Sequence, residues 1–77
     1  MNKQRRKRLS EATELLGAAL SIIEEVKAEE EEAFDNLPEG IQCGERGEQM
    51  EEYISILDDV YGSIEELDLQ ITEIIEG

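Results

Sequence analysis

The amino-acid sequence predicts an all-α protein: an antiparallel coiled-coil hairpin of two long helices, expected to pair with a second copy as a four-helix bundle. Three observations support this prediction. Apolar residues recur at alternating intervals of three and four over two long segments. One proline-containing break separates these segments. Each segment also carries more apolar surface than a single neighbouring helix covers.

The first helix is expected over residues 9–35, after a basic arm at residues 1–8. Its apolar positions form one row of large residues and one row of mostly small residues, which lets a neighbouring helix approach closely. The two rows consist of Leu9, Leu16 and Ile23, and of Ala12, Ala19, Val26 and Ala33; the same spacing reaches Leu37 beyond a polar Glu30. We expect these rows to face the second helix.

The chain is expected to turn at residues 36–44. Pro38 disfavours helical geometry in the residue before it and is well suited to begin a short helical turn. Cys43 or Gly44 is placed to precede the next helix, whose first residue is Glu45. A connection this short between two long helices predicts an antiparallel hairpin.

The second helix is expected over residues 45–76. A glycine in its middle, Gly62, costs about 1 kcal/mol relative to alanine. The regular apolar spacing along the whole segment outweighs this cost. The residues expected to face the first helix are Met50, Tyr53, Leu57, Val60, Ile64, Leu67, Ile71 and Ile74.

Further apolar residues would be exposed on a single hairpin. A chain this short buries little core by itself, so self-association of this surface is the preferred interpretation. The alternative is that the same surface binds a different protein. The residues assigned to self-association are Leu15, Leu20, Ile22, Ile54, Tyr61 and Ile75.

The chain is strongly acidic, with 21 Asp and Glu residues, 7 Lys and Arg residues and a formal net charge of −14. An acidic body repels nucleic acid backbones and anionic lipids, so we expect neither membrane binding nor direct nucleic-acid binding. The expected partner is a protein with a basic surface. A marginally disordered chain that folds on binding is an alternative, which the unbroken apolar spacing disfavours.

The basic arm has two interpretations. It contacts an acidic partner or nucleic acid, or it offsets acidic residues at the end of the second helix. In an antiparallel hairpin the arm lies near Glu73 and Glu76, where basic side chains also suit the negative end of the helix dipole. We prefer this structural interpretation because no aromatic residue is interleaved with the basic ones.

The sequence lacks the residue types that catalysis needs. Histidine is absent and Cys43 is the only cysteine, so an activated nucleophile or a zinc site is not expected. A calcium-binding loop and the Glu-x-x-His motif of di-iron bundles are also absent. The protein is therefore predicted not to be an enzyme, with no catalytic, cofactor-binding or metal-binding residues. A lone cysteine without a signal sequence predicts a cytoplasmic location.

An acidic tip is predicted around the turn, since carboxylates of both helices meet there in a hairpin. Acidic runs are more often a solvated face that keeps a small protein soluble, and this is the preferred interpretation. The alternative is a binding role for a basic partner or imitation of a phosphate backbone. Like charges and acids near a helix C-terminus oppose stability, which supports this alternative. The residues are Glu29, Glu30, Glu31, Glu32, Asp35, Glu48, Glu51 and Glu52.

The turn and its flanks, with Phe34, Asn36, Leu37 and Pro38, resemble small acidic helical-hairpin proteins of phages, prophages and mobile elements. That family has no settled activity, so it transfers no functional residues. The resemblance implies a mobile-element protein that binds and inhibits a host protein, such as a defence or nucleic-acid-processing protein. The alternative is a structural scaffold for phage or replication components, in which the turn residues matter more than the acids.

Overall fold

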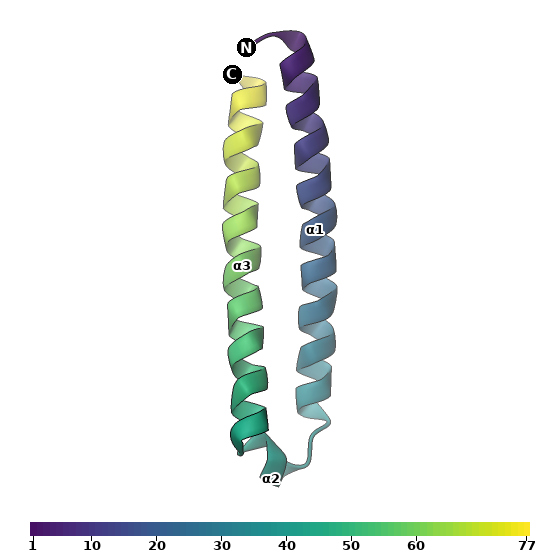
Figure 1. Ribbon diagram of the computed structural model, residues 1–77, viewed down its shortest axis with the longest axis vertical. Helices are drawn as coiled ribbons and strands as arrows, with labels where there is room; N and C mark the ends of the chain where they lie inside the picture. Colours follow the sequence, from purple (N-terminus) through teal and green to yellow (C-terminus); the bar gives the residue numbers. More distant parts are fainter.

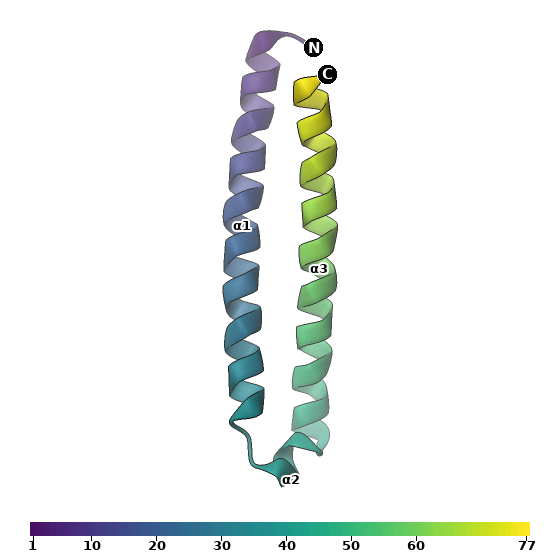
Figure 2. The same ribbon diagram turned by 180° about the vertical axis from the view of Figure 1, so that it is seen from behind.

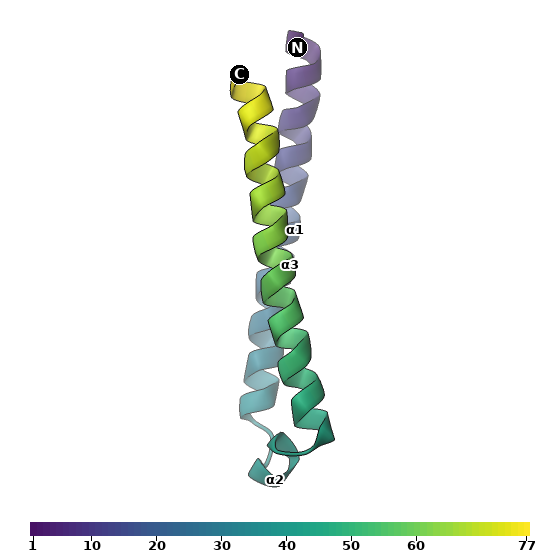
Figure 3. The same cartoon turned by 90° about the vertical axis from the view of Figure 1, so that its left-hand side faces the viewer.

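The computed structural model describes all residues, 1–77, and contains only helices: α1 (Lys3–Asp35), α2 (Glu39–Gln42) and α3 (Glu45–Glu76). The long helices α1 and α3 lie antiparallel, α2 closes one end, and both termini meet at the open end (Figures 1 and 2). The hairpin measures 58 × 14 × 12 Å. A view along the plane of the hairpin shows the helices crossing at a shallow angle (Figure 3). The prediction of an all-helical chain is confirmed.

Helix α1 begins earlier than the sequence pattern predicts. It starts at Lys3, so most of the basic arm forms its first turns and is not a separate segment. The Asn2 side chain caps it by accepting a hydrogen bond of 2.9 Å from the Arg5 amide. Lysine, arginine and glutamine are good helix formers, and this cap satisfies an amide that would otherwise lack a partner.

The turn is held by short-range contacts. The Leu37 amide donates to the Phe34 carbonyl at 3.1 Å, and Pro38 starts α2. The Gln42 side chain then donates to the Phe34 carbonyl at 2.8 Å. Gly47, in the first turn of α3, is buried against the main chain of Gln42, where any Cβ would collide. This close approach requires glycine and joins α2 to α3.

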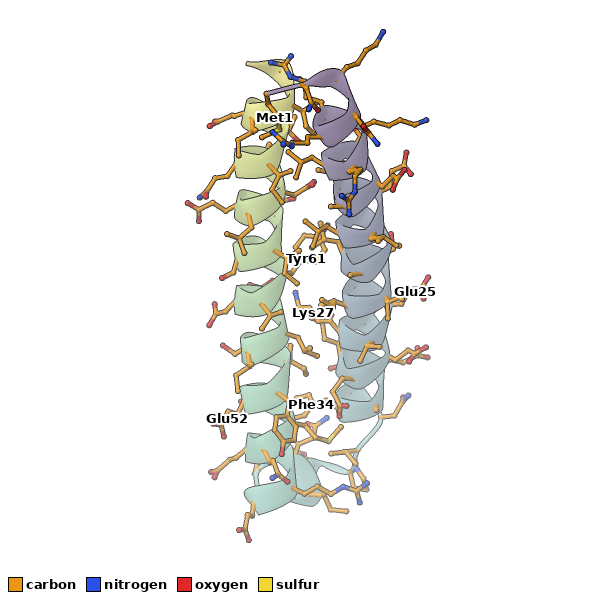
Figure 4. All side chains as sticks on the ribbon, turned by 45° about the horizontal axis from the view of Figure 1, so that its top comes forward. Met1, Glu25, Lys27, Phe34, Glu52 and Tyr61 are labelled. Atoms are coloured by element: carbon orange, nitrogen blue, oxygen red, sulfur yellow. The ribbon has the colours of Figure 1, made fainter.

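The interhelical seam is the series of buried and half-buried residues that runs along both long helices at alternating intervals of three and four. Phe34, Lys27 and Tyr61 lie in it between the two ribbons (Figure 4). On α1 the seam comprises Arg6, Leu9, Thr13, Leu16, Leu20, Ile23, Lys27, Glu30 and Phe34, followed by Leu37 after the helix end. On α3 it comprises Gly47, Met50, Ile54, Leu57, Tyr61, Ile64, Asp68, Ile71 and Ile75.

One of the two predicted rows on each helix is wrong by one position. The seam keeps the row of Leu9 and Leu16 but replaces the alanine-rich row by the row that contains Leu20 and Phe34. These larger side chains fill the space between the helices, which alanines would leave empty. Leu20 is also the most buried hydrophobic residue, with 9% of its surface exposed.

This shift also corrects the residues assigned to self-association. Leu15 and Ile22 are exposed as that assignment requires. The other four are used inside the hairpin, because they belong to the seam. They are Leu20, Ile54, Tyr61 and Ile75.

Candidate protein-interaction site

A continuous apolar face lies along one side of the hairpin. Two antiparallel helices are related by a two-fold axis perpendicular to the plane that contains both helices. Rows that occupy equivalent positions beside the seam on α1 and α3 therefore lie on the same side of the hairpin. Two rows on each long helix make up this face. The first comes one residue before the seam row of Leu20 on α1 and of Tyr61 on α3. The second comes two residues after that seam row and lies farther from the seam. The residues of this face are Ala12, Leu15, Ala19, Ile22, Val26 and Ala33 on α1, and Tyr53, Ile56, Val60, Leu67 and Ile74 on α3.

The large side chains of the apolar face are well exposed, from 38% for Val60 to 72% for Leu15. Among the residues that share these rows, Glu29 is the only acid. Arg5 and Arg8 continue the face at the open end. In a chain with 21 acidic residues, an apolar surface that holds one carboxylate is a distinct structural feature.

The polar face is the opposite side of the hairpin and its outer edges. It holds every acidic residue of α1 and α3 other than Glu29 and the seam residues Glu30 and Asp68. Glu25 and Glu52 illustrate this arrangement, because both point away from the seam (Figure 4). The hairpin therefore separates its apolar and acidic surfaces onto different sides.

Lys27 is the one basic residue in the middle of the hairpin, and it reaches from the seam towards the polar face. Its Nζ donates a hydrogen bond of 2.9 Å to Asp58 Oδ1 and lies 3.6 Å from Glu31 Oε1. The hydrogen bond to Asp58 is the main reason that the pKa of Lys27 lies above 10.5. The long side chain covers apolar surface while its ammonium group stays near solvent.

The structure divides the predicted acidic tip among three sides of the closed end. Glu30 is half-buried in the seam and Glu29 lies on the apolar face. Only the remaining members lie together on the polar face. These are Glu31, Glu32, Asp35, Glu48, Glu51 and Glu52.

A shallow, open hollow lies at the start of α3, beside the acidic tip. It is lined entirely by polar residues, namely Glu45, Arg46, Glu48, Gln49 and Glu52. No three acidic or cysteine residues come close enough together to hold a metal ion. A charged, open surface of this kind suits a basic protein surface better than a small apolar ligand.

The predicted turn residues build the closed end. Phe34 and Leu37 are half-buried, whereas Asn36 and Pro38 are exposed. The Phe34 side chain lies in the seam, and its carbonyl accepts the bond from Gln42. Their positions give Phe34 and Leu37 a clear structural role.

Sequence reasoning missed the acid in the seam. Asp68 is half-buried, and its Oδ1 is shielded from solvent without a hydrogen-bond partner. The signal was present, because Ile54, Tyr61 and Ile75 form a row seven residues apart that passes through position 68.

Comparison with protein families, curated proteins and solved structures finds no match. Neither long helix contains an apolar stretch of the kind that a membrane crossing requires. The proposed function therefore rests on the geometry of the hairpin.

Proposed function

We propose that this protein is a non-enzymatic, cytoplasmic protein-binding module. Its apolar face joins two copies into a four-helix bundle, and its polar face contacts a protein with a basic surface. The observation that carries the proposal is the separation of surfaces: an apolar face spans both helices, and nearly all carboxylates of the helices lie elsewhere. A single hairpin leaves that apolar face in water, whereas a dimer covers it.

The α3 row that lies outside the seam supports self-association. From Tyr53 to Ile74 this row, with Val60 and Leu67 between, contains no charged residue, yet it lies outside the seam. The row inside the seam contains Asp68. Complete burial of one large apolar side chain stabilises a protein by about 1.5–3 kcal/mol, so a second copy on this face adds stability that one hairpin lacks.

Pairing through the apolar face leaves the polar faces on the outside of the bundle. Their carboxylates attract basic protein surfaces and speed their encounter. A surface that normally holds a nucleic acid backbone is one such target. The resemblance of the turn to mobile-element proteins supports a partner among host defence or nucleic-acid-processing proteins, with inhibition as the result.

The test is an affinity pull-down of the tagged protein from a bacterial lysate at low and at raised salt, with mass spectrometry of the retained proteins. We expect a nucleic-acid-handling protein that raised salt releases. Lysine replacements of Glu48, Glu51 and Glu52 should abolish its retention.

The matched control carries lysine at Glu11, Glu14 and Glu73, three exposed acids near the open end. It should retain the partner, and circular dichroism should show both variants folded. Retention of the partner by the closed-end variant would contradict binding through the acidic tip.

A scaffold for phage or replication components is the second candidate, favoured by the half-buried positions of Phe34 and Leu37 at the closed end. In that case phage infection should be needed for partners to be retained. Alanine at Phe34 and Leu37 should then release these partners while the helix signal persists, and the lysine variants should still bind them.

A further inference from the structure

We infer that the second copy lies antiparallel across the apolar face, with a two-fold axis close to Ala19 and with Arg8 of each copy beside Glu29 of the other. This inference rests on the self-association in the proposed function and specifies its geometry. The polar face is left free for another partner.

The charge along the hairpin selects this orientation. Five of the 7 basic residues lie in the first eight positions, which form the open end. The closed end holds the acidic tip, with Lys27 and Arg46 as its nearby basic residues. Two parallel hairpins would place both acidic ends together, whereas antiparallel hairpins place each acidic end beside a basic one.

Charges on the apolar face itself fix the register. Arg8 comes eleven residues before Ala19, and Glu29, the only acid in these rows, comes ten residues after it. Each helical residue advances by about 1.5 Å, so two α1 helices that run antiparallel about Ala19 bring these side chains level within about 2 Å. The one carboxylate on the face then meets a guanidinium group.

Side-chain size agrees with the same axis. Leu15 becomes level with Ile22 of the second copy, and Ala12 with Val26 of the second copy. Ala19 meets its own counterpart at the axis, where a small side chain lets two helices approach closely. The α1 surface is thus complementary to itself when one copy is reversed.

Helix α3 gives an independent check. The contact between Lys27 and Asp58 sets the register of α3 beside α1. It places Ala19 level with roughly position 66 of α3, given equal rise along both helices. That position lies one residue from the midpoint between Ile56 and Ile74. The same axis therefore brings Ile56 of one copy within about 3 Å of the level of Ile74 of the other.

The orientation can be measured on the unaltered sequence, because Cys43 is the only cysteine and is exposed at the closed end. A nitroxide spin label on Cys43 reports the distance between the closed ends of two copies by double electron–electron resonance. We expect a distance comparable to the 58 Å length of the hairpin.

Each other outcome has a distinct meaning. A distance no greater than the width of the bundle would show parallel hairpins and overturn this inference alone. The absence of a dipolar signal, with a monomer mass in sedimentation equilibrium, would overturn the self-association as well. Partner binding to the polar face is measured separately by the pull-down, so the two proposals fail independently.

Charge exchange tests the proposed contact. Arg8→Glu and Glu29→Arg should each raise the dimer dissociation constant about tenfold, since each change affects two symmetric pairs of about threefold each. The double variant should restore the original dissociation constant. The control pairs Arg8→Glu with Glu25→Arg on the polar face and should not restore it. Failure of the double variant to recover would refute the contact.

Discussion

Gln42 Nε2 donates a hydrogen bond of 2.8 Å to the main-chain oxygen of Phe34. The same nitrogen lies 3.4 Å from the Asp35 carbonyl. These carbonyls belong to the last turn of α1, where the amides four residues ahead are not available as partners. The Phe34 carbonyl also accepts from the Leu37 amide at 3.1 Å. One side chain of α2 thus caps α1, and the main chain of the same residue lies against Gly47 of α3. All three helices meet at Gln42.

Replacement of Gln42 by alanine removes this cap. We expect the free energy of unfolding to fall by about 1 kcal/mol, the typical contribution of one such hydrogen bond. Urea unfolding followed by circular dichroism at fixed protein concentration measures the change. Gln4→Ala, at an exposed position of α1 without a side-chain hydrogen bond and outside the apolar face, is the control and should have a smaller effect. Equal effects would show that the cap adds nothing.

Gly47→Ala and Gly62→Ala should change stability in opposite directions. A Cβ at Gly47 collides with the main chain of Gln42, whereas a Cβ at Gly62 meets nothing within 4 Å. Alanine at Gly62 should add about 1 kcal/mol through its higher helix propensity. Alanine at Gly47 should lower the thermal midpoint, because the turn must move. Stabilisation by Gly47→Ala would disprove the close approach at the closed end.

Asp68→Leu should stabilise the hairpin. The shielded Oδ1 of Asp68 has no hydrogen-bond partner, and a buried unsatisfied oxygen costs about 1–3 kcal/mol. Leucine removes this cost and adds apolar contact in the seam. Asp59→Leu, at an exposed position, controls for the higher helix propensity of leucine. A gain in chemical-denaturation midpoint no larger than that of Asp59→Leu would count against burial of Asp68.

The ion pair of Lys27 should make stability depend on alkaline pH. The pKa of Lys27 is raised above 10.5, chiefly by the hydrogen bond to Asp58. A raised pKa means that the folded state holds the proton more tightly. The contribution is therefore complete below about pH 10.5 and is lost as pH rises through the folded-state pKa.

The measurement compares wild type with Lys27→Met by thermal unfolding between pH 8 and pH 12, a range set by the lysine pKa of about 10.5. The difference between the two proteins should shift in favour of the variant as pH rises. Every other titratable group is common to both proteins, so the comparison isolates the loss of the Lys27 ammonium group. A difference that does not change with pH would show that the pair is too exposed to matter.

The hairpin and its turn could be predicted because they depend on local signals. Apolar spacing and Pro38 place the helices and the break, and the predicted second helix covers the same range as α3. The start of α1 was missed since a basic run has no apolar pattern, although Asn2 is a suitable N-cap residue. The N-cap residue Asn2 is the sequence signal that marks the start of α1.

The seam could not be assigned from spacing alone. Each helix offers two candidate rows one residue apart, and both satisfy intervals of three and four. The choice depends on side-chain volume against the opposite helix, which favours Leu20 and Phe34 over alanines. An error of one position assigns an exposed row to the space between the helices. For this reason the residues of the apolar face were predicted to lie in the seam.

Leu20 is the only hydrophobic residue that the hairpin buries, and this small core has a consequence for the protein in a cell. If the proposed dimer supplies most of the core, the folded fraction rises with the number of copies present. At low abundance such chains would be open to proteases, and at high abundance they would protect one another. Synthesis rate would then switch the activity of this protein on and off without any ligand.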